Sequence, residues 1–438
     1  MKTKKVLSIL LVALILCALG SVGNLIDLGF FPKALALASS GTCGNGVKWS
    51  FNANTGLLTI SGTGAMTDYA NGNSSPFNRA TEIKKVSISS GVTSIGSYSF
   101  YNCYLMESIS IPSSVSNIGK SAFYNCSSLT SLSIPLGVRS IGELAFSECN
   151  SLKNVYLGNT VSTIGSSAFR SCDALTGVTI PFTVSSIGAW AFEGCTNLMS
   201  VSLNYGLRTI DSWAFSKCVN LTSIDIPDSV TKIGVGTFNW CSNLSNVKLS
   251  ENLTTIPSSA FSYCMKLNDI TIPNNVTLID TNAFSYCSRI NSISIGSKVE
   301  NIRKAAFLGC ASIHEVYYDG TESQWNAVVI DDDNDSLINA SVYFGQIEHE
   351  HDYKLNIIVN SSCESSGEGV YICECGDSYT TDLPKLDHED PDNDGYCNNG
   401  CEKMMTGGNH CKYCGKIHDG AFGWLVKFFH SIMAIFKR

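Results

Sequence analysis

The chain has 438 residues, of which 44% are hydrophobic and 15% charged, with a formal net charge of −8 and 19 cysteines. The charge is concentrated near the C-terminus: residues 348–438 carry 15 acidic and 8 basic side chains, so residues 1–347 are almost neutral. An almost neutral surface attracts phosphates only weakly, which argues against nucleic acid as a partner.

The N-terminus has the pattern of a secretory signal peptide. Lys2, Lys4 and Lys5 precede an apolar stretch at residues 6–19, and small-residue cleavage sequences follow at 34–38. The alternative is an uncleaved N-terminal anchor. Because no other stretch is apolar enough to span a bilayer, we expect the rest of the chain to be exported.

A 23-residue period dominates the next part of the chain. Phenylalanine recurs three residues before each repeat cysteine, and isoleucine eight residues before it. A period of this length with fixed apolar positions predicts a stacked solenoid. The cysteines that mark the period are Cys103, Cys126, Cys149, Cys172, Cys195, Cys218, Cys241, Cys264, Cys287 and Cys310.

One repeat is typified by residues 129–149. Leu132 and Ile134 alternate with serines, which predicts a strand, and Pro135 ends that strand. Gly142 allows a tight turn, after which the Ala-Phe-x-x-Cys segment returns along the convex side as a short helical or 3₁₀ turn. A single repeat buries too little to fold alone, so stacking must stabilise it.

These segments resemble the leucine-rich repeats of the BspA-like bacterial surface family. The resemblance rests on the repeated I-G-x-x-A-F-x-x-C and L-x-x-L-x-I-P sequences, on the opening residues 40–44 and 58–64, and on a closing sequence at 318–325. It covers about residues 40–345. It implies an α/β solenoid with a curved parallel β-sheet, an exported binding or adhesion protein, and no catalytic residues.

The repeat cysteines all share one structural position beside a buried phenylalanine. The sequence therefore predicts a ladder of small buried thiols. The alternative is a set of disulfides between neighbouring repeats, which export favours and which the spacing alone allows.

The concave strand face is one candidate binding surface. Its predicted outward positions hold short polar residues with few charges, a composition suited to a protein or glycan and also to a merely solvated sheet. The candidate residues there are Tyr156, Thr179, Asp225, Lys248 and Thr271.

The convex side offers a second candidate. Trp and Tyr occupy positions that are small or polar in most other repeats, so they could form an exposed platform for a sugar ring or a protein. The alternative is packing between neighbouring turns. The candidate residues are Trp190, Trp213, Trp240, Tyr263 and Tyr286.

The C-terminal region is rich in cysteine and histidine. Two close cysteine pairs, Cys397 with Cys401 and Cys411 with Cys414, resemble a zinc-knuckle or zinc-ribbon arrangement and suggest a structural zinc ion. Disulfides are the alternative in an exported chain. A second site could draw on His351, Cys363, Cys373, Cys375 and His388.

The last residues, 421–438, combine Trp and Phe with Lys and His. This composition predicts either an amphipathic helix in a membrane interface or a segment packed on the Cys-rich module. The sequence Asp-x-Asp-x-Asp-Gly at 390–395 is a weak calcium-loop signal, because the twelfth position is Cys401 in place of a glutamate.

The distribution of histidine argues against an enzyme. All seven histidines lie at or after His314, so the repeats lack His-based acid–base chemistry. The leading prediction is an exported cell-surface or secreted protein that binds an extracellular protein or glycan; the alternative is an envelope scaffold without a specific ligand. The predicted parts are a signal peptide (1–38), an N-terminal cap (39–80), repeats (81–318), a C-terminal cap (319–346), a Cys/His-rich module (347–420) and a tail (421–438).

Overall fold

The computed structural model describes residues 37–345, 353–359, 367–373, 378–383, 405–406 and 410–411. The chain divides into two compact units, residues 1–347 and 348–438. The predicted signal peptide, apart from residues 37–38, and the predicted tail at 421–438 lie outside the described residues.

The first unit opens with an antiparallel cap and then becomes parallel. Strand β1 pairs with β2 and β2 with β3 in antiparallel fashion, and β3 then pairs in parallel with the first repeat strand. The cap contains β1 (Ser40–Gly44), β2 (Val47–Asn52), β3 (Leu57–Gly62), β4 (Gly64–Ala65) and the 3₁₀ helix η2 (Gly72–Ser74).

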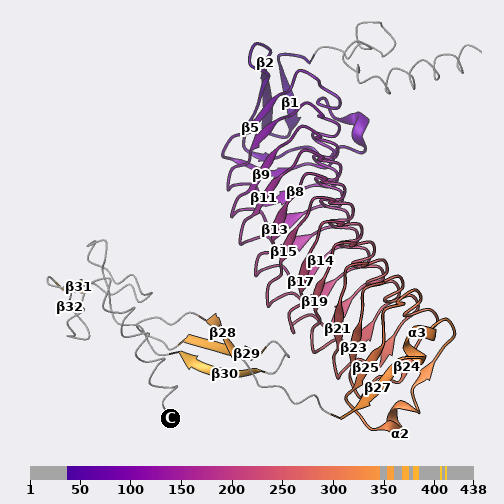
Figure 1. Cartoon of the computed structure of the whole chain (residues 1–438). Coiled ribbons are helices and arrows are strands. Elements are labelled where there is room, and N and C mark those ends of the chain that lie inside the picture. The colour runs from indigo at the N-terminus through magenta and orange to yellow at the C-terminus, as the bar shows by residue number, and fades with distance from the viewer. Residues whose placement is uncertain are drawn as a thin grey trace, which may run out of the picture. The chain divides into compact units, whose positions relative to one another are not determined.

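The repeats stack along one solenoid, and each contributes a strand to a first parallel series (Figure 1). We name the outward side of this series the strand face. Register follows the 23-residue period, so that Tyr156 lies beside Ser133 and Asp225 beside Lys248. The series comprises β5 (Lys85–Ile88), β7 (Ser108–Ser110), β9 (Ser131–Ile134), β11 (Asn154–Leu157), β13 (Gly177–Thr179), β15 (Ser200–Ser202), β17 (Ser223–Asp225), β19 (Asn246–Lys248), β21 (Asp269–Ile272), β23 (Ser292–Ile295), β25 (Glu315–Tyr318) and β27 (Ser341–Phe344).

A second parallel series runs along another side of the solenoid and carries the periodic isoleucines. Its strands are mostly two residues long, because the chain turns away from the sheet directly after each isoleucine. They are β6 (Val92–Ile95), β8 (Asn117–Ile118), β10 (Ser140–Ile141), β12 (Thr163–Ile164), β14 (Ser186–Ile187), β16 (Thr209–Ile210), β18 (Lys232–Ile233), β20 (Thr255–Ile256), β22 (Leu278–Ile279), β24 (Asn301–Ile302) and β26 (Val329–Ile330).

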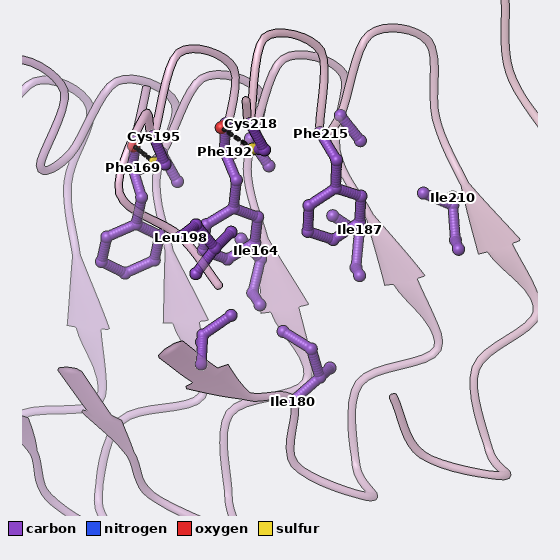
Figure 2. Packing of buried hydrophobic residues seen from close by; sticks show 14 of the residues in the cluster. Ile164, Phe169, Ile180, Ile187, Phe192, Cys195, Leu198, Ile210, Phe215 and Cys218 are labelled. Carbon is purple, nitrogen blue, oxygen red and sulfur yellow. Dashed lines mark hydrogen bonds between the residues drawn. The ribbon is translucent and has the colours of Figure 1, made fainter. Parts of the chain in front are cut away.

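The core lies between these strands and the returning segment of each repeat. Eleven fully buried phenylalanines, from Phe77 to Phe307, form one stack with ring centroids 5.0–5.6 Å apart and interplanar angles of 2–13°. Figure 2 shows part of this stack between Ile164, Ile187 and Ile210 on one side and the cysteines on the other. The predicted parallel solenoid is therefore confirmed.

The returning segment differs from the prediction in one respect. Residues 81–318, all of which are described, contain consecutive turns and no helix. In the repeat that ends at Cys195, the amides of Trp190, Phe192 and Gly194 donate to the next repeat at 3.0, 2.8 and 2.8 Å. The amides between them donate within their own repeat. A helix would direct every amide along its own axis, so it cannot make these bonds between repeats.

The turn glycine also plays a different part from the predicted one. Gly142 does not have a left-handed φ, but a Cβ at this position would lie 2.8 Å from the backbone of Gly119 in the preceding repeat. Close approach of two backbones, and not an unusual φ, therefore favours glycine here. Its amide bond to Ile118, at 2.9 Å, persists where other residues replace it: Asp211 bonds Ile187 at 3.0 Å.

The C-terminal end of the solenoid contains two short helices, α2 (Glu322–Trp325) and α3 (Asp335–Ile338). Thr321 caps α2 in a reciprocal capping box with Gln324. The second unit contains a three-stranded antiparallel sheet of β28 (Tyr353–Val359), β29 (Gly367–Cys373) and β30 (Ser378–Leu383), and a pair formed by β31 (Met405–Thr406) and β32 (His410–Cys411).

Candidate functional site

The repeat cysteines form a hydrogen-bonded ladder in the core. Each Sγ donates to the carbonyl oxygen of the phenylalanine 26 residues earlier, at 3.0–3.3 Å, as for Cys195 to Phe169 and Cys218 to Phe192 (Figure 2). All ten are buried free thiols. The predicted thiol ladder is confirmed, and the disulfide alternative does not hold for these residues.

Burial suppresses the acidity of these thiols. Desolvation raises the pKa of Cys149 and of Cys195 from 9.0 to about 12. A thiol that stays protonated is a poor nucleophile and a poor metal ligand. The ladder therefore stabilises the stack and offers no reactive centre.

The strand face presents the predicted outward side chains to solvent. Tyr156 is 58% exposed, and Thr179, Asp225 and Thr271 are also exposed. Lys248 is half-buried beside Asp225, its partner in the register of β17 and β19. These five residues lie at one position of β11, β13, β17, β19 and β21, with Ser202 of β15 between Thr179 and Asp225, so they belong to a single row along the solenoid.

A charged cluster interrupts this row. Desolvation raises the pKa of Asp225; Lys248 opposes the increase and Asp228 adds to it. Glu251 shows the same pattern: desolvation and then Asp228 raise its pKa, and Lys248 lowers it. Asp228 also accepts a hydrogen bond from the backbone amide of Glu251, at 2.9 Å. The three carboxylates and one ammonium group leave this part of the face acidic.

The sequence analysis missed an adjacent set of exposed residues. Leu136, Phe182 and Tyr205 are 59%, 68% and 59% exposed, and each lies just beyond the end of a repeat strand. They share one position of the 23-residue period. The signal was available in the sequence, because an apolar residue directly after the strand-ending Pro135 or Pro181 has no place in the core.

The predicted turn-side aromatics fall into two groups. Trp240, Tyr263 and Tyr286 stack on one another, with centroid separations of 4.2 and 4.6 Å and interplanar angles of 8° and 15°. Tyr286 in turn lies against Gly309, where a Cβ would be 2.8 Å from its ring. Trp213 lies against Gly236 in the same way.

This stacking covers the ring faces that a sugar would need. Trp240 and Tyr286 are each 43% exposed. The geometry therefore favours packing between turns over an open aromatic platform, and binding at this side stays a prediction. Trp190, also 43% exposed, lies in the repeat before Trp213.

All five of these aromatics have a left-handed backbone. Their φ values are 55° at Trp190, 61° at Trp213, 61° at Trp240, 62° at Tyr263 and 61° at Tyr286. A bulky residue is unusual in this region. Some other repeats have glycine or asparagine there, as at Gly194 and Asn125, and others have Ser, Glu or Lys, also with positive φ. The strain is offset by the hydrogen bond that each of these residues donates, through its own backbone amide, to the next repeat.

The metal prediction lies almost entirely outside the described residues. Only the backbones of Cys373 and Cys411 are described, in β29 and β32, while Cys363, Cys375, Cys397, Cys401, Cys414, His351 and His388 are not. Nowhere in the described ranges do three or more His, Cys, Asp or Glu side chains gather so as to hold a metal ion. Zinc in the C-terminal unit stays a prediction.

The membrane predictions have a similar status. Among the residues that the structure describes, none of the helices has the length and apolar character that a bilayer crossing requires. The predicted interfacial tail is not among those residues.

Stacked 23-residue turns, two parallel strand series and a continuous phenylalanine core define the class of leucine-rich-repeat solenoids. The chain belongs to the family with BspA-type leucine-rich repeats, whose model matches residues 73–198, 162–291 and 208–328, together more than half of the sequence. This confirms the predicted resemblance. No curated protein matches the chain at a significant level.

Several solved structures are similar to this chain. A leucine-rich cell surface protein from Faecalibacterium prausnitzii is 28% identical, with a TM-score of 0.37 over 67% of this chain and 98% of that one. A leucine-rich repeat protein from Bacteroides ovatus is 21% identical, with a TM-score of 0.37 over 69% and 99%. The pneumococcal vaccine antigen PcpA is 15% identical, with a TM-score of 0.40 over 72% and 100%.

Proposed function

We propose that this chain is an exported adhesion-type protein, cell-surface or secreted, whose strand face binds an extracellular protein or glycan. One observation carries the proposal. The core positions are almost constant from repeat to repeat, whereas the outward position of the strands changes from serine to Tyr156, Asp225 or Lys248. Chemical variety on the strands is thus found on the side of the sheet that faces away from the core, where a partner can make contact.

The backbone beneath this row suits binding. Each strand is held in register by its neighbours, and each turn is bonded to the next repeat. A rigid surface loses little conformational entropy when a partner binds. The row also extends over many strands, so it offers room for the roughly 800 Å² per partner that a specific interface needs.

The test is a binding screen of the full chain against immobilised extracellular matrix proteins and a glycan array. We expect saturable binding that weakens about 30-fold in the variant Tyr156→Ser/Lys248→Ser, since interface hot spots contribute about 2 kcal/mol. The matched control is Trp240→Ser on the turn side, which should bind normally.

The other outcomes identify other functions. Absence of any saturable partner would favour the envelope scaffold. Lost binding in Trp240→Ser while that variant stays folded, and normal binding in the strand-face variant, would move the site to the turn side.

A further inference from the structure

A row of residues at the ends of the repeat strands changes chemistry along the solenoid. We name it the strand-end rim: Leu136, Asn159, Phe182, Tyr205, Asp228 and Glu251, one from each of six consecutive repeats. Leu136, Phe182 and Tyr205 are large, apolar and more than half exposed. The two residues that follow are carboxylates. The rim is therefore apolar in its first part and acidic in its second.

The apolar part is continuous with the strand face. Its one polar member, Asn159, follows Tyr156 by three residues in the same repeat, and Tyr156 is itself 58% exposed. In the repeat whose rim residue is the polar Asn159, an exposed aromatic, Tyr156, therefore lies close to the rim. Soluble proteins seldom expose neighbouring large apolar side chains without a binding role.

Tyr205 marks the boundary between the two parts, because the next rim residue, one repeat on, is Asp228. Partial burial raises the pKa of Tyr205, and the carboxylates of Asp225 and Asp228 raise it further. The acidic part consists of Asp225, Asp228 and Glu251, with Lys248 as the neighbouring cation. Its net formal charge is negative, so it attracts a cationic group.

We propose that the strand-end rim binds an extended protein segment in which apolar side chains are followed by lysine or arginine. This inference rests on the proposed binding function and specifies its partner. Strands lie about 4.8 Å apart, so the rim from Leu136 to Glu251 spans about 24 Å, the length of roughly seven residues of extended chain at about 3.3 Å each. A protein segment can supply both apolar and cationic side chains over that length, whereas a neutral glycan lacks the cation.

The experiment is selection of a random twelve-residue peptide library on the full chain, followed by affinity measurement of the selected consensus peptide at low and high salt. We expect sequences with apolar residues followed by Lys or Arg. The variant Phe182→Ser/Tyr205→Ser should weaken binding at least tenfold, and Asp228→Asn/Glu251→Gln should weaken it and flatten its salt dependence.

Matched controls are Val235→Ser, which removes an exposed apolar side chain elsewhere, and Glu143→Gln, which removes an exposed carboxylate. Both should bind like the wild type. Phe182→Ser/Tyr205→Ser, Val235→Ser and Glu143→Gln change exposed side chains, and Asp228→Asn keeps the side-chain oxygen that accepts the Glu251 amide, so all four variants are expected to fold, which their melting temperatures check.

Two results would overturn the inference. One is a selected peptide, or a ligand from the extracellular panel, that binds the Phe182→Ser/Tyr205→Ser variant with unchanged affinity; the binding function itself would then stand. The other is a library and a panel that both yield no saturable binder, which would overturn the proposed function as well.

Discussion

Each repeat cysteine is a buried acid whose proton is also used as a hydrogen-bond donor. Burial holds the pKa of Cys149 and Cys195 near 12, against 9.0 in the unfolded chain. Between these values the unfolded state releases thiol protons that the folded state retains. The free energy of unfolding must therefore fall as the pH rises through this range.

We predict that the stability of the solenoid is unaffected by these thiols below about pH 9 and falls steeply from pH 9 to 12. Each buried thiol should contribute a loss of about 1.4 kcal/mol per pH unit. Urea unfolding at pH 7.5, 9.5 and 10.5 measures the effect. The control is Cys149→Ala/Cys195→Ala, whose slope should be shallower by two thiol contributions; an unchanged slope would contradict the prediction.

At the scale of the element, the returning segment links repeats through alternate amides and left-handed residues. The sequence analysis predicted a short helical or 3₁₀ turn for the Ala-Phe-x-x-Cys segment. The spacing of the apolar residues does not indicate which residues have left-handed φ. The signal for φ lay in the other positions, where Asn102, Asn125, Gly194 and Gly309 recur one residue before cysteine. Asparagine and glycine are the residues that adopt left-handed φ most readily.

Tyr263 stacks between Trp240 and Tyr286, and its backbone φ is 62°. We therefore make a prediction about its replacement. Tyr263→Ala should destabilise the protein, because each lost ring pair contributes about 0.5–1.5 kcal/mol. Tyr263→Gly should destabilise it by about 1 kcal/mol less than Tyr263→Ala, because glycine relieves the left-handed strain.

Urea unfolding of both variants provides the measurement, and a double-mutant cycle with Trp240→Ala isolates the ring pair. Equal stability of the Ala and Gly variants would show that the backbone is unstrained. A coupling energy near zero would show that the stack does not stabilise the turn.

At the scale of the whole molecule, each repeat packs its core against its neighbours, and every repeat offers them the same core. Deleting residues 104–126 removes one complete period and joins Cys103 to Ser127, which preserves the register of strands and phenylalanines. We predict that this variant folds and unfolds cooperatively with a modest loss of stability.

Deleting residues 104–125 is the matched control. It removes 22 residues, so the strand that follows is displaced by one residue and its apolar side chains turn towards solvent. Circular dichroism and urea unfolding should show a severe loss of structure or stability. Similar stability of the two deletions would mean that register does not govern the fold.

Much of this molecule could be predicted from its sequence because repetition makes the core pattern visible. The buried Phe and Cys columns and the outward row from Tyr156 to Thr271 follow directly from spacing. The strand-end rim was missed because Leu136 and Phe182 are single apolar residues next to prolines, and apolar residues beside a core pattern are easily assigned to the core. Their position directly after the strand-ending prolines, together with their exposure in the structure, separates them from it.

The constant 23-residue register also has a consequence for heredity. Segments that encode neighbouring turns are alike in length and frame, so unequal recombination between them would add or remove whole turns and leave the reading frame and the core intact. Each such event would lengthen or shorten the rim by one strand spacing of about 4.8 Å. A lineage could in this way alter the reach of its binding surface in discrete steps without redesigning the fold.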